Sequence, residues 1–439
     1  MQRMTQGSIA GHLLRYAIPL ILGNFFQLAY NAVDSIIVGK CAGEQALAAV
    51  SAANPVMTIV ILGVSGLSIG ASVLMSRFYG AGDEEKLRRE LATTLVFGAA
   101  ASFTVFVLGL VFVPGLLRFM NVPRVILPMA QDYLRVIFVG FLFTFQVNIL
   151  SAALRSVGDA AAPVRFLAAA SVLNALLDVL LVAGLGWGAV GAGLATVIAQ
   201  AVCMLLCAVY IVRRVPLLRI PLRSVRVDHD LLRQTLQSGC ITALQQACQP
   251  IGKALIQSVI NAQGVSVIAA FNAVSRVDDF ACIPEQSISS AMMTCIAQNR
   301  GAGEDARVRD TLRKGMIMEI AYGVGIGLVV LALRSPIMRL FAAQDSAQMM
   351  QMGVSYLGVI AFFYMLPGLT NGIQGYFRGM GEMRTTLAAT LIQISVRTLV
   401  VYGIVPRVGI TGAAYACAIG WGCMLVFTTA MYGKMQKRR

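Results

Sequence analysis

The sequence predicts an all-α polytopic membrane protein with twelve transmembrane helices in two pseudo-symmetric six-helix bundles. Of its 439 residues, 58% are hydrophobic and only 13% are charged, and the mean hydropathy is +0.76. A water-soluble domain carries about 25% charged residues, so this chain has more apolar surface than a soluble fold can bury. Three observations support the fold class: the composition, the succession of apolar segments, and an internal repeat.

Twelve apolar segments are each long enough to cross a bilayer, which takes about 20 helical residues. They cover residues 13–38, 47–77, 92–117, 127–155, 163–184, 188–212, 232–261, 266–299, 312–341, 351–378, 384–404 and 409–434. A proline inside such a segment removes a backbone hydrogen bond, and a kink is expected at four of them. These prolines are Pro19, Pro250, Pro284 and Pro367.

The basic residues gather in short clusters between alternate apolar segments, as Arg213, Arg214 and Arg219 do. Because Lys and Arg concentrate in cytoplasmic loops, this pattern predicts that both termini are cytoplasmic. The expected location is a bacterial-type inner membrane, with the lipid bilayer as the surrounding partner. The formal charge of +15 would also suit a nucleic-acid partner, but basic clusters flanking apolar segments argue against one.

An internal repeat divides the chain near its middle. Three short motifs of the first half recur in the same order and at almost the same spacing in the second half. They are Gly80–Asp83 with Gly301–Glu304, Arg155–Asp159 with Arg378–Glu382, and Gly188–Ala192 with Gly409–Ala413. Since each half has six spans, the repeats are parallel. We therefore expect an N-lobe (1–212), a cytoplasmic linker (213–230) and a C-lobe (231–439).

Ionisable side chains inside the apolar spans are functional candidates, because a charge at membrane depth costs about 2.5 kcal/mol or more. The first half offers Asp34 and Asp178, and Asn174 precedes Asp178 by one turn on the same helix face. Asn148 and Thr196 add polar groups, although interhelical hydrogen bonding explains either of them about equally well. This oxygen-rich set predicts a site for a proton or a sodium ion.

The second half departs from this pattern. The repeat carries Asn148 onto Asn371, but the basic residues Lys253 and Arg397 stand near positions that match acidic and polar ones. We therefore expect the coupling ion to bind in the first half only. Lys253 and Arg397 are expected either to line the cavity and steer substrate or stabilise one conformation, or to snorkel and pair with carbonyl groups.

No enzyme is expected, because the sequence has no nucleophile–base constellation, P-loop lysine or nucleotide-binding domain. No cofactor is expected either, so an ion gradient must drive any transport. The glycine-rich stretches at 63–70, 184–193 and 323–327 fit close helix approach better than phosphate binding.

The chain resembles the multidrug and toxic compound extrusion (MATE) family over nearly its whole length. The resemblance rests on Tyr30-Asn31-Ala32-Val33-Asp34, the two Gly-Ala-Gly-acid loops, the Arg155 and Arg378 turns, and the Asn174/Asp178 pair. It implies a V-shaped, outward-opening monomer of two lobes. Such a protein exports organic cations in exchange for H⁺ or Na⁺ by alternating access.

The resemblance also implies roles for particular residues. The coupling cation, with Na⁺ as one possibility, is expected at Asp34, Asn174, Asp178 and Thr196. Residues expected to line the cavity are Gln27, Tyr30, Tyr133, Asn148, Lys253, Asn371 and Arg397. Pro19 is the expected hinge of the first span.

Two alternative functions stay open at this point. A lipid-linked oligosaccharide flippase of the same superfamily would use Lys253 and Arg397 in a cationic cavity, whereas twelve spans and two first-half carboxylates favour drug export. A channel or membrane scaffold without coupled transport would show no dependence on Asp34 or Asp178.

Overall fold

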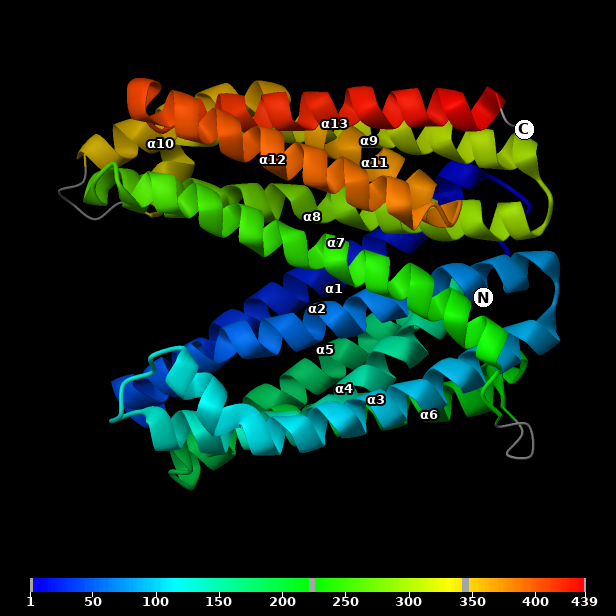
Figure 1. Cartoon of the computed structure of the whole chain (residues 1–439), viewed down its shortest axis with the longest axis horizontal. Helices are drawn as coiled ribbons and strands as arrows, with labels where there is room; N and C mark the ends of the chain where they lie inside the picture. The colour runs from blue at the N-terminus through cyan, green and yellow to red at the C-terminus, as the bar shows by residue number, and fades with distance from the viewer. Residues whose placement is uncertain (1–2, 221–225, 342–346, 438–439) are drawn as a thin grey trace. The chain divides into compact units, whose positions relative to one another are not determined.

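Long apolar runs of this sequence form long helices, as expected where backbone groups must be satisfied without water. The computed structural model describes residues 3–220, 226–341 and 347–437, and no strand occurs within these ranges (Figure 1). The helices are α1 (Ile9–Ile37), α2 (Gly43–Ala81), α3 (Glu84–Phe119), α4 (Leu127–Ser156), α5 (Ala161–Asp178), α6 (Gly188–Arg214), α7 (His229–Asn261), α8 (Val265–Gly301), α9 (Asp305–Arg339), α10 (Ala347–Ile360), α11 (Met365–Gly379), α12 (Met383–Val408) and α13 (Thr411–Lys437). The all-α fold class is confirmed.

The helices match the twelve expected spans when α10 and α11 count as one. By length and apolarity, eight helical stretches of the described residues qualify for crossing a membrane, and the α10–α11 pair makes a ninth. One of the eight, Ile9–Ala81, contains both α1 and α2. The remaining two, α7 and α8, are 33 and 37 residues long but carry more polar side chains.

One expected span is not a continuous helix. The segment 351–378 was expected to form a single span with a kink at Pro367, and α10 and α11 meet at an angle of 47° with a short 3₁₀ turn, Ala361–Phe363, between them. Pro367 lies in the first turn of α11, where a proline is tolerated because no helical N–H is needed. The other three prolines lie inside α1, α7 and α8, where the expected kinks stay a prediction.

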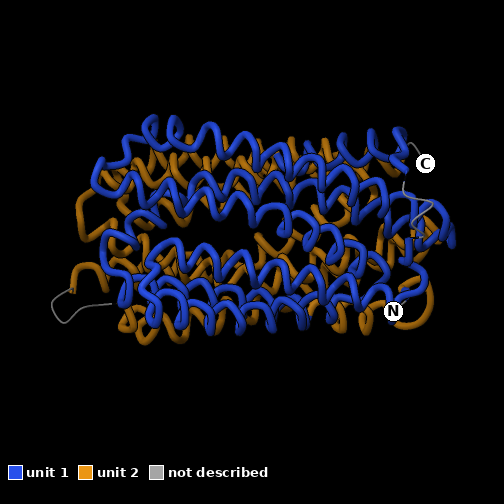
Figure 2. Tube along the Cα trace, turned by 90° about the horizontal axis from the view of Figure 1, so that it is seen from below, with its two compact units in different colours: residues 1–3, 18–243 blue, residues 4–17, 244–439 orange. Residues whose placement is uncertain are grey.

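The helices form two compact units (Figure 2). The first unit contains Met1–Arg3 and Ile18–Ala243, and the second contains Met4–Ala17 and Leu244–Arg439. The boundaries therefore fall inside α1 and inside α7. The expected lobe boundary at 213–230 stays a prediction, and residues 221–225 of that segment lie outside the described residues.

Small residues let α2 and the first half of α7 pack backbone against backbone within the first unit. A Cβ atom on Gly66 would lie 2.4 Å from the backbone nitrogen of Ala243, and one on Gly70 would lie 2.8 Å from that of Gly239. Small residues four apart on each helix are the usual basis of such close packing in membranes. The expected close helix approach along 63–70 is confirmed at these two glycines.

The repeated Gly-Ala-Gly-acid motif forms the turn between α2 and α3 and again between α8 and α9. Gly82 has a φ angle of 74° and Gly303 one of 77°, in the left-handed region that favours glycine. The Asp83 side chain caps α3 by accepting the Lys86 backbone N–H at 3.0 Å. This bond, reinforced by the Lys86 ammonium group, lowers the pKa of Asp83.

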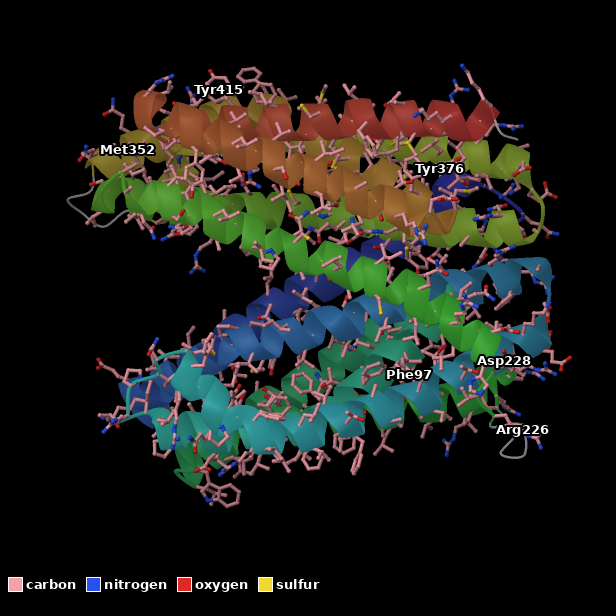
Figure 3. The ribbon with its side chains drawn as sticks, viewed as in Figure 1. Phe97, Arg226, Asp228, Met352, Tyr376 and Tyr415 are labelled. Carbon is pink, nitrogen blue, oxygen red and sulfur yellow. The ribbon has the colours of Figure 1, made fainter. Side chains whose placement is uncertain are left out.

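The start of α7 is fixed to α3 within the first unit. Asp228, labelled in Figure 3, accepts the backbone N–H groups of Asp230 and Leu231 at 3.1 and 3.2 Å and so caps α7. One turn further on, the Thr235 hydroxyl donates to the buried carboxyl group of Glu90 at 2.5 Å. These bonds explain why the first part of α7 belongs to the first unit.

The N-terminal segment is held by the second unit. The Met4 backbone N–H donates to Gln298 Oε1 at 3.0 Å. The Arg307 guanidinium group donates to the carbonyl oxygens of Met4 and Gly7 at 2.9 and 3.1 Å. Further along α1, the Tyr16 and Thr294 hydroxyls lie 2.9 Å apart.

We expect Arg307→Ala to release this N-terminal segment. Hydrogen bonds from a charged group contribute about 1.5–3 kcal/mol in proteins, so local opening should become at least about tenfold more frequent. Hydrogen–deuterium exchange of residues 4–17 would measure the change. Arg309→Ala is the matched control, because Arg309 is exposed on the same turn of α9. Equal exchange rates in the two variants would contradict the anchoring role.

Candidate cation and substrate sites

Four helices of the first unit bring six polar side chains together. They are Tyr30 and Asp34 on α1, Tyr133 on α4, Asn174 and Asp178 on α5, and Thr196 on α6. Residues four apart share one face of a helix, so α1 and α5 each present a pair to the same place. Gly23 allows this approach, since a Cβ atom there would lie only 2.9 Å from Val164 on α5.

Asn174 is the centre of the hydrogen-bond network. With its amide oriented to satisfy its neighbours, its nitrogen donates to Asp178 Oδ2 at 2.7 Å and to the Tyr30 hydroxyl at 3.1 Å. Its amide oxygen accepts the backbone N–H of Thr196 at 2.9 Å. Only 1% of Asn174 is exposed. Asn174 therefore joins Asp178 to Tyr30 of α1 and Thr196 of α6.

The carboxyl groups of Asp34 and Asp178 face one another. Asp178 is fully buried, and Asp34 is half-buried. One oxygen of each, Oδ1, is a buried atom without a hydrogen-bond partner. Two facing carboxylates repel each other unless a cation neutralises part of their charge.

This geometry suits a monovalent cation. Within the described residues, no three His, Cys, Asp or Glu side chains come together in a way that could hold a metal ion. A proton needs no coordination shell, and a sodium ion would find oxygen atoms on Asp34, Asp178, Asn174 and Thr196. The residues present therefore fit either coupling ion.

Two tyrosines border the acidic pair, whereas two expected lining residues bond within their own helices. Tyr133 is buried near both aspartates, and its hydroxyl contacts Met57 Sδ at 3.8 Å. Asn148 donates to the Thr144 carbonyl oxygen at 2.8 Å, and Gln27 donates to Asn31 at 3.1 Å. Among the hydrogen bonds of the described residues, none joins Asn148 or Gln27 to the acidic pair.

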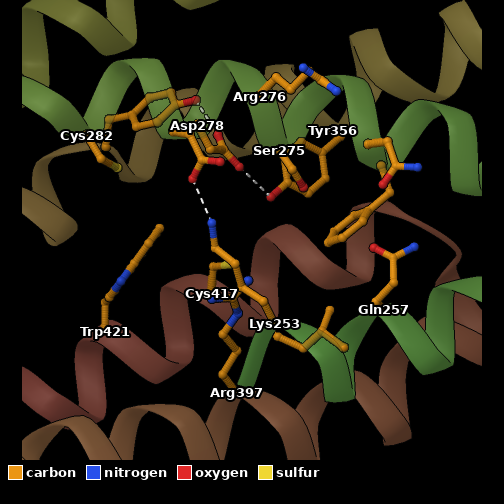
Figure 4. Close-up of a pocket in the computed structure, with 15 residues that line it drawn as sticks. Lys253, Gln257, Ser275, Arg276, Asp278, Cys282, Tyr356, Arg397, Cys417 and Trp421 are labelled. Atoms are coloured by element: carbon orange, nitrogen blue, oxygen red, sulfur yellow. Dashed lines mark hydrogen bonds and ion pairs between the residues drawn. The ribbon is translucent and has the colours of Figure 1, made fainter. Parts of the chain in front are cut away.

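The second unit contains a pocket of about 620 Å³ whose lining includes both charged and apolar side chains (Figure 4). Lys253 on α7 and Arg397 on α12 both line it, and their expected role toward substrate stays a prediction. At the pocket, Lys253 forms an ion pair with Asp279 of α8 at 2.7 Å, and both side chains are more than half exposed. Lys253 thus pairs with an acid at the pocket.

Deeper in the pocket, Asp278 is held by two tyrosines. It accepts the hydroxyl protons of Tyr356 and Tyr364 at 3.1 and 2.5 Å. Arg397 lies close enough to interact with the Asp278 charge, while its Nε atom is buried without a hydrogen-bond partner. Trp421 adds an aromatic wall. The pocket therefore offers opposite charges and an aromatic surface side by side.

Four carboxylates of the second unit were missed in the sequence. They are Asp278, Asp279 and Glu285 on α8 and Glu319 on α9. The contrast between an acidic first half and a basic second half is therefore wrong. It arose because only repeat-matched positions were compared, although these acids stand inside the expected spans 266–299 and 312–341.

Asn371 lies apart from the pocket lining. It belongs to α11, where its carbonyl oxygen accepts the Ser289 hydroxyl at 2.6 Å. Its side chain faces Glu285. The expected contribution of Asn371 to a substrate cavity stays a prediction.

Two repeated helical units with ionisable groups buried between long apolar helices define a multi-pass membrane transporter and not an enzyme. Comparison with known proteins gives the same class. The chain belongs to the MatE family, whose model matches residues 19–180 and again residues 242–402. The double match confirms the internal repeat, and the resemblance to the MATE family is confirmed.

Curated relatives cover most of the chain. The probable multidrug resistance protein YpnP of Bacillus subtilis is 29% identical over 390 residues, which are 88% of this chain and 86% of that protein. An FAD transporter of Shewanella oneidensis is 24% identical over 391 residues, 87% of this chain and 85% of that protein.

Solved structures share the fold. A crystal structure of MATE in the bent conformation matches with a TM-score of 0.90 at 24% identity, covering 99% of this chain and 96% of that one. A transporter of the MOP superfamily from Pyrococcus furiosus matches with a TM-score of 0.89 at 24% identity, covering 99% and 97%.

Proposed function

We propose that this protein is a secondary active antiporter of a bacterial inner membrane that exports organic cations in exchange for H⁺ or Na⁺. The observation that supports it best is the Asp34–Asp178 pair, two facing carboxyl groups each with an unpartnered buried oxygen. We place both termini in the cytoplasm and treat the protein as a monomer.

The acidic pair gives a physical route to coupling. With the coupling ion bound, the pair is partly neutral and attracts an organic cation weakly. After the ion leaves, the excess negative charge attracts a lipophilic cation, and Tyr30 and Tyr133 offer aromatic faces for it. Transport follows if the two facing states differ in their affinity for the two cations.

Pro19 is the proposed hinge of this cycle. It is the second residue of α1 inside the first unit, because the unit boundary falls between Ala17 and Ile18. Asp34 stands on the same helix, fifteen residues further on. A change of bend at Pro19 would therefore move Asp34 relative to Asn174 and Asp178.

Aromatic anions are a second candidate cargo. The relatives named for multidrug resistance suggest broad substrate range, and one relative is named for FAD. In the second unit, Lys253, Arg276 and Arg397 outnumber the two acids that line the same pocket. A flippase for lipid-linked oligosaccharides would need more free positive charge, because Lys253 and Arg397 both have acidic neighbours.

Export from proteoliposomes tests this proposal. The protein is reconstituted with ethidium as a fluorescent organic cation, and H⁺ and Na⁺ gradients are imposed separately. We expect accumulation of ethidium under one of the two gradients and none when both are collapsed. FAD serves as the anionic cargo in a parallel series. No transport of either compound under either gradient would contradict the proposal and direct attention to lipid-linked substrates.

A further inference from the structure

The pocket of the second unit leaves one basic group without a close partner. Arg397 of α12 lines the pocket and is partly exposed. Within the described residues it forms no ion pair, and its Nε atom is buried without a hydrogen-bond partner. Asp278 is near enough for its charge to act on Arg397, but too far for an ion pair. A guanidinium group that is withdrawn from water without acceptors is costly, so this part of the pocket lacks an acceptor.

The two acids of the pocket, in contrast, already have their donors. Asp278 accepts the hydroxyl protons of Tyr356 and Tyr364, and Asp279 pairs with Lys253 at 2.7 Å. Within the described residues, no oxygen of either acid is a buried atom without a hydrogen-bond partner. What the pocket leaves unsatisfied is therefore a donor, which calls for an anionic or polar acceptor and not for a cation.

The ion pair between Lys253 and Asp279 can open at little cost. Their side chains are 60% and 59% exposed, and water and salt screen an exposed pair strongly. In Figure 4, Lys253 and Arg397 approach from one side of the pocket and Asp278 from the other. The flexible stem of a lysine lets its ammonium group turn from Asp279 toward a ligand next to Arg397.

The same ion pair disfavours a free cation. The Lys253 ammonium group already occupies the accessible carboxylate of the pocket, and it is tethered to the protein. A tethered group acts at a high effective concentration, so a free cation competes with it poorly. An anion meets no such competitor at Arg397.

An aromatic surface lies beside Arg397. Gly420 of α13 packs against the base of this side chain, since a Cβ atom on Gly420 would lie 3.1 Å from Arg397 Cβ. Trp421, the next residue of α13, lines the pocket. A flat ring on Trp421 would thus place an attached acidic group near the guanidinium group. The pocket volume of about 620 Å³ also suits a drug-sized ligand, for which pockets of about 300–1,000 Å³ are usual.

We propose that this pocket binds an aromatic anion, with its ring on Trp421 and its acidic group held by Arg397 and by Lys253 after Lys253 leaves Asp279. Carboxylate and phosphate groups both offer the paired oxygen acceptors that a guanidinium group binds. Lys253 is then the residue that makes the pocket select anions over cations. A role of the pocket in transport rests on the proposed function, in which aromatic anions are a second candidate cargo, but binding itself does not.

Equilibrium binding to the purified protein tests the proposal without transport. Flavin mononucleotide (FMN) and riboflavin share one aromatic ring system and differ by a phosphate group, so their comparison isolates the acidic group. Binding is followed by quenching of Trp421 fluorescence in a Trp187→Phe background, since these are the two tryptophans of the chain. Ethidium is the cationic comparison, measured with Asp34→Asn added so that the first acidic pair does not contribute. Thermal unfolding in detergent identifies any variant that fails to fold.

FMN is expected to bind saturably and at least about tenfold more tightly than riboflavin or ethidium. Lys253→Gln and Arg397→Gln should each weaken FMN binding by at least about tenfold and leave riboflavin binding unchanged. Asp279→Asn should strengthen FMN binding by about two- to fivefold, because it releases Lys253 from a weak exposed pair. Lys314→Gln is the matched control, because Lys314 forms a similar ion pair with Asp310 at 2.8 Å away from the pocket lining.

Equal affinities for FMN and riboflavin, or tighter binding of ethidium than of FMN, would overturn the proposal. Unchanged FMN binding by folded Lys253→Gln would overturn the role of Lys253. If FMN binds as expected but is not transported under either gradient, the anionic cargo of the proposed function fails and the pocket assignment stands. If ethidium is exported and FMN does not bind, the proposed function stands and the pocket assignment fails. Should Arg397→Gln fail to fold, the variants at the exposed residues Lys253 and Asp279 decide the outcome.

Discussion

Asp34→Asn is expected to abolish gradient-driven export. The asparagine side chain keeps the size and polarity of Asp34 but carries no charge, so the pair loses one of its two negative charges and attracts cations less strongly. Export of ethidium from proteoliposomes should fall by more than about tenfold, since losing about 1.4 kcal/mol of cation attraction already accounts for that factor. Because Asp34 is half-buried and its removal relieves a like-charge contact, the variant should fold normally.

Asp132→Asn is the matched control for this experiment. Asp132 lies on α4 of the same unit, but it is exposed and forms only a surface ion pair with Arg135 at 3.2 Å. Exposed pairs of this kind contribute about 0–1 kcal/mol, so export should stay at the wild-type level. Undiminished export by Asp34→Asn under the gradient that drives the wild type would remove the central support for the coupling site.

Gly66→Leu is expected to disrupt the first unit. A Cβ atom at this position would lie 2.4 Å from the backbone nitrogen and 2.5 Å from the Cα atom of Ala243, neither of which can move without displacing α7. Overpacking of this kind costs about 1–3 kcal/mol, and here it also separates α7 from α2. The variant should show a lower unfolding temperature in detergent and reduced yield from membranes.

Gly63→Leu provides the comparison on the same helix. No atom outside its own helix lies within 4 Å of the Cβ position at Gly63, one turn away from Gly66. This substitution should leave the unfolding temperature unchanged, and it is compared directly with Gly66→Leu. Equal unfolding temperatures of the two variants would show that α2 and α7 are not held by this contact.

Most of the helices could be predicted from the sequence, because backbone groups at membrane depth have no water to bond with and must form hydrogen bonds within a helix. An apolar run of sufficient length must become a helix at membrane depth, so the spans could be found from hydropathy alone. The break between α10 and α11 was predictable in part, because a proline disrupts the helical turn before it and the bend occurs at Tyr364, three residues before Pro367. Its position depends on tertiary contacts, such as the hydrogen bond from Tyr364 to Asp278.

The first acidic site was partly predictable. The spacing of Asn174 and Asp178 places both on one face of α5, but their contact with Tyr30, Asp34 and Thr196 depends on how α1 and α6 pack. The expectation that these residues share one site came from the resemblance to the MATE family. The internal repeat did not predict the carboxylates of the second unit, because they lie on α8 and α9 and not on the helices that match α1 and α5. Inspecting every acid within each span would have found them.

The unit boundaries within α1 and α7 have a consequence for how this tandem repeat can be divided. Residues 4–17 belong to the second unit although they lie in the expected N-lobe, and residues 231–243 belong to the first unit although they lie in the expected C-lobe. The opening segment of each expected lobe therefore packs in the unit that contains most of the other lobe, which resembles an exchange of arms within one chain. Cutting the gene between the repeats would leave two fragments that each lack a part of their own bundle.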